Sequence, residues 1–277
     1  MQESAIKRWA LHIFLAATLA FMLAPILIVV VNSFNASAFN AWPPHGFTLD
    51  WYRKVLANPA FQRGTVNSLI IGVISTAIVL VLGTPIAYAL ARIRLRGVTG
   101  LKAILFAPLI VPRVAIGFAM FVLFVALGTA TGLRLYGTFT GVILAHCVLM
   151  LPFVVAILTV SFGEVDPIVE EAARDLGASP IAAFRLAVLP QIKGALLVSG
   201  IFAFITSFDE VETTLFVVRP AVNTLPVEMY HFLEQYQDPT IAALSTLLIA
   251  FTFFIALAVP FAVKGNELLR MMTSGKQ

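Results

Sequence analysis

The chain has 277 residues, of which 60% are hydrophobic and only 12% are charged. Soluble domains carry about 25% charged residues, so this composition, with a mean hydropathy of +0.97, excludes an ordinary soluble protein and indicates a membrane protein. The net charge of +4 does not indicate nucleic-acid binding, because the basic residues lie between apolar runs and form no stripe. A single cysteine, Cys147, and four scattered histidines predict neither a disulfide framework nor a metal site.

A transmembrane helix needs ~20 mostly apolar residues. Six runs meet this criterion, at residues 9–31, 68–91, 102–127, 139–162, 194–218 and 241–263. We therefore predict an all-α membrane protein with six transmembrane helices. Twelve Lys and Arg residues lie on one side of these runs and five on the other, which predicts that both chain ends and residues 163–193 are cytoplasmic.

The first apolar run is longer than the about 7–15 apolar residues of a signal peptide, so we expect it to remain as a membrane span. Residues 32–67 are rich in Pro, Asn and aromatic residues and predict an external loop with a short helix. The chain thus divides into the first span with its loop (1–66), a membrane core (67–263) and a cytoplasmic tail (264–277).

Residues 163–193 form a polar insert, and a segment that carries both signs of charge cannot lie in hydrocarbon. Asp166 followed by Pro167 is typical of a helix start, Gly177 of a helix end, and Ser-Pro at 179–180 of a second short helix. Such a hairpin would project Glu170, Glu171, Arg174 and Asp175. A solvated loop is the simpler interpretation, but the plan of two short helices favours docking of a soluble partner.

Glu-Ala-Ala at 171–173, followed by Gly177 and by Leu-Pro at 189–190, resembles the EAA motif of ABC importer permeases. This chain has Ala187 where that family usually has Ile. The segment is the family's coupling helix, so the resemblance implies that Glu171 makes an ionic contact with an ATPase subunit. It also implies that the two alanines allow close approach and that Gly177 forms the turn. The coupling residues expected on this basis are Glu170, Glu171, Ala172, Ala173, Asp175 and Gly177.

Five further segments are similar to the spermidine/putrescine-type branch of these permeases. They lie at residues 46–52, 67–69, 107–112, 207–210 and 238–243. The resemblance implies the transmembrane domain of a type I, binding-protein-dependent importer, with a permease core at 67–263 that imports a polyamine or related amine. It further implies a second permease subunit, two ATPase subunits that bind ATP and Mg, and a periplasmic or lipid-anchored solute-binding protein. The chain would lie in the bacterial inner membrane and would have no cofactor, metal or catalytic residue of its own. The absence of a GxxxxGK[ST] sequence agrees with this expectation.

Ionisable side chains inside the predicted spans are costly, and they mark either a solute pathway or an internal ion pair. Asp209 and Glu210 lie in the fifth run, where Thr206, Asp209 and Thr213 are spaced to share one helix face. The candidate pathway residues are Arg113, Thr206, Asp209, Glu210 and Thr213. A structural helix break is the competing interpretation of these carboxylates. His146 and Cys147 are interpreted as packing residues.

The role of Arg113, near the middle of the third run, stays open at this point. It could pair with Asp209 or Glu210, or hold the carboxylate of a zwitterionic solute such as an amino acid or an opine. It could also snorkel or contact a partner subunit. Two other classes of protein remain as alternatives. A membrane-embedded enzyme could use the acidic cluster at 209–212, and a channel or secondary transporter would need no ATPase.

Overall fold

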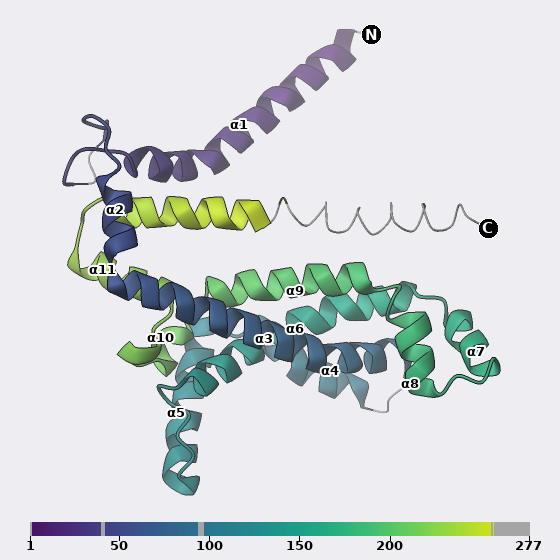
Figure 1. The fold of residues 1–277 in the computed structure, drawn as a ribbon. Helices are drawn as coiled ribbons and strands as arrows, with labels where there is room; N and C mark the ends of the chain where they lie inside the picture. Colours follow the sequence, from purple (N-terminus) through teal and green to yellow (C-terminus); the bar gives the residue numbers. More distant parts are fainter. Residues whose placement is uncertain (1, 40–41, 94–96, 256, 258–277) are drawn as a thin grey trace, which may run out of the picture. The chain divides into compact units, whose positions relative to one another are not determined.

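The structure is a computed structural model that describes residues 2–39, 42–93, 97–255 and 257. Within these residues the regular structure is helical, apart from one antiparallel bridge between Asn35 and Phe47 (Figure 1). The chain divides into two compact units. Unit 1 comprises Met1–Phe61 and Met229–Phe254, and unit 2 comprises Gln62–Glu228 and Ile255–Gln277.

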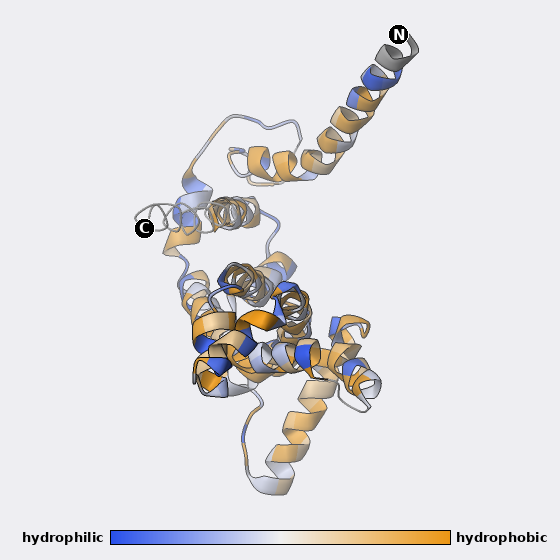
Figure 2. Ribbon diagram, turned by 90° about the vertical axis from the view of Figure 1, so that its right-hand side faces the viewer, coloured by the Kyte–Doolittle hydropathy of each residue, from blue (hydrophilic) through white to orange (hydrophobic). Residues whose placement is uncertain are grey.

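Four of the described helices are long and apolar enough to cross a membrane. They are α1 (Gln2–Asn32), α3 (Pro59–Arg92), α5 (Arg113–Thr131) and α6 (Phe139–Glu164). A fifth apolar segment is α9 (Lys193–Phe208) together with the preceding Pro180–Val188, to which it is bent by 83°. Figure 2 shows α1 as hydrophobic along most of its length, with hydrophilic residues near its N-terminal end. The helices predicted at residues 9–31, 68–91 and 139–162 are confirmed.

The third predicted span, residues 102–127, is wrong as a continuous helix. The helix α4 (Val98–Phe106) passes into a 3-10 turn (Ala107–Leu109), and α5 begins anew at Arg113. Pro112 explains the break, because proline has no N–H to donate and disfavours the helical conformation for the residue before it. Arg113 therefore starts a helix, and the depth expected from an unbroken span does not apply.

The fifth predicted span, residues 194–218, is also interrupted. The helix α9 ends at Phe208, residues 209–213 are not helical, and the short α10 (Thr214–Val217) follows. A second 3-10 turn (Pro220–Val222) then leads to α11 (Leu225–Gln235). Three acidic residues within four positions at the break would have had to enter an apolar helix, which explains why the helix does not continue.

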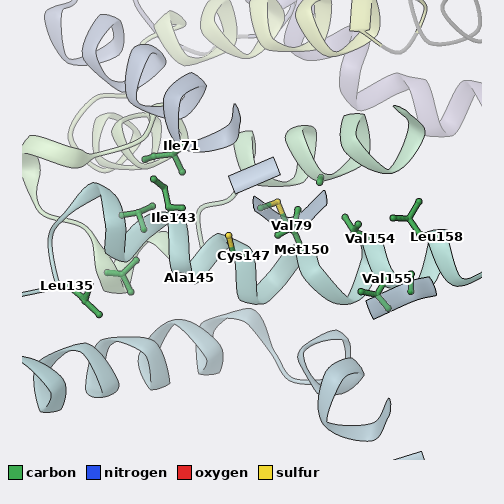
Figure 3. Close-up of a cluster of buried hydrophobic side chains, with 14 of the residues drawn as sticks. Ile71, Val79, Leu135, Ile143, Ala145, Cys147, Met150, Val154, Val155 and Leu158 are labelled. Carbon is green, nitrogen blue, oxygen red and sulfur yellow. The ribbon is translucent and has the colours of Figure 1, made fainter. Parts of the chain in front are cut away.

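The helix α6 is the central element of unit 2. Of its apolar window 61% is buried, against 28% for α3 and 17% for α5. Val154, Val155 and Leu158 of α6 are fully buried and form one cluster with Ile71 and Val79 of α3 (Figure 3). A helix buried on most sides needs apolar residues all round, which is why α6 has no polar face.

Unit 1 contains α1, α2 (Asp50–Ala57), the end of α11 and a helix at Thr240–Ile255. The helix α2 is the short helix predicted within residues 32–67. The Tyr52 hydroxyl lies 2.6 Å from Ser33 Oγ, which ties α2 to the end of α1. The described part of the sixth predicted span ends with Thr240–Ile255, since residues 256 and 258–263 and the tail 264–277 lie outside the described residues.

Lys54 joins α2 to the segment that follows α11. Its ammonium group forms an ion pair with Asp238. The same group lies over three aromatic rings, at 5.5 Å from the centroid of Trp51, 5.7 Å from that of Phe232 and 5.9 Å from that of Tyr236. Contacts at this distance are attractive because the face of an aromatic ring is electronegative.

Candidate functional site

The polar insert folds as the pair of short helices that the sequence predicts. It contains α7 (Pro167–Asp175), α8 (Pro180–Ala183) and a π-helical turn (Phe184–Val188). Asp166 caps α7, because its Oδ1 accepts a hydrogen bond of 2.9 Å from the N–H of Ile168. Ser179 caps α8 by accepting a hydrogen bond of 3.3 Å from the N–H of Ala182. Both caps satisfy backbone donors that have no partner within their own helix.

Gly177 ends α7 as predicted. Its N–H donates to the carbonyl of Arg174 at 2.8 Å, and the N–H of Ala178 donates to the carbonyl of Ala173 at 3.1 Å. This pair of bonds is a Schellman motif, which requires a left-handed residue at its turn. Gly177 has a φ of +91°, where a Cβ would be strained. The turn that directs the chain from α7 into α8 therefore depends on this glycine.

The outward surface of the insert combines acidic and apolar side chains. Glu171, Ala172 and Asp175 are exposed. Large apolar side chains on the same hairpin are 65% to 90% exposed, namely Ile168, Leu176, Ile181 and Leu186. Exposed apolar side chains on a polar hairpin are compatible with a surface that a partner protein covers.

Glu170 does not belong to this outward surface. It is 8% exposed and is the one buried residue of α7, so the expectation that it projects from the hairpin is wrong. The Tyr88 hydroxyl of α3 lies 2.7 Å from each of its carboxylate oxygens, and Nη2 of Arg174 lies 3.1 Å from Oε1. Two donors therefore hold the carboxylate between α7 and α3.

Sequence reasoning missed Tyr88, because 82 residues separate it from Glu170. The ring of Tyr88 packs edge-on against Phe162 of α6 and Phe184 of the π-helical turn, with centroid distances of 5.4 Å and 5.0 Å. The one sequence signal was topological, since the predicted orientation puts the end of the second span and the insert at the same membrane surface.

The second candidate site is the break between α9 and α10. Nη1 of Arg113 lies 2.9 Å from Oε2 of Glu210, and Oε1 of Glu210 accepts a hydrogen bond of 2.7 Å from the N–H of Thr213. The Thr213 hydroxyl donates in turn to the carbonyl of Arg113 at 3.1 Å. The side chain of Glu210 is 1% exposed, whereas that of Arg113 is 44% exposed. Of the partners considered for Arg113, the structure thus selects Glu210.

Two further residues fix this break from neighbouring helices. A Cβ on Gly117 of α5 would lie 2.8 Å from the Cα of Thr213, so the two backbones approach more closely than any other residue would permit. His146 of α6 is fully buried, with Nδ1 at 2.7 Å from Ser207 Oγ and Nε2 at 2.9 Å from Thr214 Oγ1. The packing role expected for His146 therefore includes two polar contacts.

The tautomer of His146 follows from the bonds around it. The Thr214 hydroxyl donates to the carbonyl of Glu210 at 3.1 Å, so its oxygen is left to accept from Nε2. Nδ1 then accepts from the Ser207 hydroxyl. The signal that sequence reasoning passed over was the presence of hydroxyl side chains in an apolar run.

The face expected for Thr206, Asp209 and Thr213 does not exist. Their spacing requires a helix through residue 213, whereas α9 ends at Phe208. Asp209 is exposed and Thr213 is fully buried, so the two point to different surroundings. Throughout the residues that the structure describes, no three His, Cys, Asp or Glu side chains gather so as to hold a metal ion.

No family model matches the chain, but curated relatives do. It is 31% identical over 246 residues to the spermidine/putrescine transport system permease protein PotC of Escherichia coli K12, covering 88% of this chain and 90% of that protein. It is 33% identical over 231 residues to the putrescine transport system permease protein PotI of the same strain, with 83% and 82% covered.

Solved structures show the same fold. A bacterial ABC transporter involved in the import of the acidic polysaccharide alginate gives a TM-score of 0.72 at 17% identity, covering 95% of this chain and 98% of that one. The MetNI methionine ABC transporter gives a TM-score of 0.60 at 19% identity, covering 74% and 95%. These likenesses show that the chain has the fold of an ABC importer permease.

The chain belongs to the spermidine/putrescine-type family of ABC importer permeases. It is a multi-pass membrane protein and a transport subunit, not an enzyme. Permeases of this kind have no cofactor of their own and work with a second permease, with ATPase subunits and with a periplasmic binding protein.

Proposed function

We propose that this chain imports polyamines or related amines as one of two permease subunits in a bacterial inner membrane. Both curated relatives carry polyamine transport in their names, and this is the observation that carries the proposal. Six spans, cytoplasmic chain ends and a cytoplasmic insert belong to the proposal, and the distribution of Lys and Arg supports them.

In the proposed assembly, two ATPase subunits bind ATP and Mg, and one of them docks on the outward surface of the insert. Glu171, Ala172 and Asp175 are exposed there beside apolar side chains, as an interface requires. Closure of the ATPases would move the insert and switch the pathway between its two open states. A solute-binding protein would deliver the amine on the opposite side. Coupling of this kind needs an element with two states that both partners bias.

The charges at the break support a cationic solute. Glu210 is neutralised by Arg113, whereas Asp209 and Glu212 are exposed and have no ion-pair partner among the described residues. Exposed carboxylates that form no salt bridge suit ammonium groups, although the charge of Arg113 also acts on Asp209. An amino acid or an opine would instead need a free cation for its carboxylate, and Arg113 is already engaged. This contact favours the amine over the zwitterionic alternative.

A reconstitution experiment tests the proposal. The chain is assembled in proteoliposomes with its partner permease, the ATPases and the binding protein, and uptake is measured for putrescine, spermidine, amino acids and opines. We expect ATP-dependent uptake of the amines. Amino-acid or opine uptake without amine uptake would contradict the proposed solute. Solute flux through this subunit alone would point to a secondary transporter, and turnover without ATP or partners would point to an enzyme.

Glu171→Ala tests the docking surface. We expect it to lower amine uptake at least about tenfold, because removing one charge of an ionic pair at an interface costs ~1.4 kcal/mol or more. Recovery of the ATPase with the purified permease should fall in parallel. Glu234→Ala is the matched control, since Glu234 is a solvent-exposed glutamate of α11 in unit 1. Normal uptake and recovery in Glu171→Ala would refute the role of Glu171.

A further inference from the structure

In the helix α7 all residues but one are exposed or half-buried. Glu170 is the single buried residue of α7, and its immediate neighbour Glu171 is exposed. A buried carboxylate is costly unless hydrogen bonds satisfy it. The donors that satisfy Glu170 come from two different elements, Arg174 of α7 itself and Tyr88 of the membrane helix α3.

Tyr88 also contacts the insert through its ring. Its edge-on contacts reach Phe184 of the π-helical turn and Phe162 of α6, and Phe162 and Phe184 lie 6.0 Å apart, centroid to centroid. One side chain of α3 thus meets both halves of the insert and the helix from which the insert emerges. Aromatic pairs at these separations are attractive beyond the area that they bury.

The hydroxyl of Tyr88 adds a directional hydrogen bond, which the ring contacts do not provide. A hydrogen bond from a neutral donor to a carboxylate is short and roughly twice as strong as one between neutral groups. Arg174 also donates to Oε1 of this carboxylate at 3.1 Å, so two donors fix the rotamer of Glu170. A displacement of α7 therefore pulls on the hydroxyl of Tyr88 as well as on the chain connections at the two ends of the insert.

We infer that Tyr88 and Glu170 form a clasp that transmits movement of the insert to α3 and α6, with Tyr88 as a positioning residue for coupling. This inference rests on the proposed function, because it assumes that an ATPase moves the insert. Without the clasp, α7 can turn about its connections while the membrane helices stay in place. ATP hydrolysis then continues with little transport.

Tyr88→Phe tests the clasp, because it removes the hydroxyl and keeps the ring. In the full assembly in proteoliposomes, we expect putrescine transported per ATP hydrolysed to fall about tenfold, which corresponds to ~1.4 kcal/mol. Complex recovery, the rate of ATP hydrolysis and the KM for the loaded binding protein should stay within about twofold of wild type, since no interface residue changes. Tyr52→Phe is the matched control, because it removes a tyrosine hydroxyl that lies 2.6 Å from Ser33 Oγ in unit 1.

Two Glu170 variants give an independent measure of the hydrogen bond. Glu170→Gln keeps an acceptor for Tyr88 and should retain most of the transport per ATP, whereas Glu170→Leu should lose it. Tyr88→Phe combined with Glu170→Leu should be no worse than either variant alone, because both remove the same contact.

The outcomes separate this inference from the proposed function. A wild-type assembly that binds no ATPase or transports no amine would refute the proposed function. A wild-type assembly that couples normally, with Tyr88→Phe equal to Tyr52→Phe, would overturn the clasp alone. If Tyr88→Phe fails to assemble, the comparison of Glu170→Gln with Glu170→Leu decides, and equal coupling in these two variants would overturn the clasp.

Discussion

The insert around α7 and the break around Glu210 are both polar interruptions of an apolar chain, yet they are built differently. In the insert, the caps by Asp166 and Ser179 and the turn at Gly177 join residues no more than five positions apart. At the break, Glu210 and Arg113 are 97 positions apart. The caps and the turn of the insert can therefore be recognised in a short stretch of sequence, whereas the ion pair at the break depends on packing.

The same difference separates the two neighbouring glutamates of the insert. Glu171 follows the local pattern and faces outward, while Glu170 is turned inward by a tyrosine of another helix. Local rules thus fix where the hairpin lies and where it bends. Long-range contacts fix which of its side chains remain free for a partner.

The largest effect is expected where the break depends on a long-range ion pair. Arg113→Met should lower the free energy of unfolding by about 3 kcal/mol, because it leaves the buried Glu210 without its counter-charge. Thermal unfolding in detergent can be followed with a thiol-reactive dye, since Cys147 is the single cysteine of the chain and is buried.

Arg53→Met is the control for this prediction. Arg53 also forms an ion pair, with Asp50, but both side chains are highly exposed, so we expect a loss below about 1 kcal/mol. Equal melting temperatures for the two arginine variants would mean that the break does not depend on a buried ion pair.

A smaller effect is expected where the insert depends on a local turn. Gly177→Ala should cost about 1–2 kcal/mol, because alanine must adopt the left-handed φ of +91°. Gly194→Ala is the control, since a Cβ there meets nothing within 4 Å and the residue lies within α9. Limited proteolysis of the hairpin would report the change, and equal cleavage of both variants would contradict a strained turn.

The smallest effect concerns unit 1 and its dependence on pH. Burial alone would raise the pKa of Asp238, but hydrogen bonds from Lys54 and Thr240 and the charge of Lys54 hold this pKa below its ordinary value of 3.8. A carboxyl with a lowered pKa in the folded state stabilises the protein above its unfolded-state pKa. That contribution is lost as the pH falls through the folded-state pKa.

Melting curves followed by circular dichroism between about pH 6 and pH 3 test this prediction across the range in which aspartates titrate. Wild type should lose more stability on acidification than Asp238→Asn does. Asp175→Asn, which changes an exposed carboxylate of α7, should follow the wild-type curve. Parallel curves for wild type and Asp238→Asn would show that the contact with Lys54 contributes nothing measurable.

Much of the architecture was predictable because hydrophobic length is a local property. The runs at 9–31 and 139–162 match α1 and α6, and the caps of α7 and α8 lie where the sequence predicts them. The third and fifth spans were predicted as continuous because a hydropathy window averages over short interruptions. Pro112 breaks one of them, and the acidic cluster at 209–212 breaks the other.

Helical spacing also misled the prediction of the candidate pathway. Thr206, Asp209 and Thr213 share a face only on a helix that continues through the break, and the end of α9 at Phe208 separates them. Tyr88 and His146 were missed as functional partners because no spacing relates them to Glu170 or to Thr214.

The sequence by itself determined that the chain is an all-helical membrane protein with a polar hairpin, and the motif in that hairpin identified the family. Capping residues and a left-handed turn act over a few residues and apolar length over a single helix, so all three can be recognised in the sequence. Only the tertiary structure decided that Glu170 faces Tyr88 and that Glu210 neutralises Arg113. These pairings depend on which helices lie side by side, because a buried carboxylate accepts hydrogen bonds from the donors that packing brings within about 3 Å.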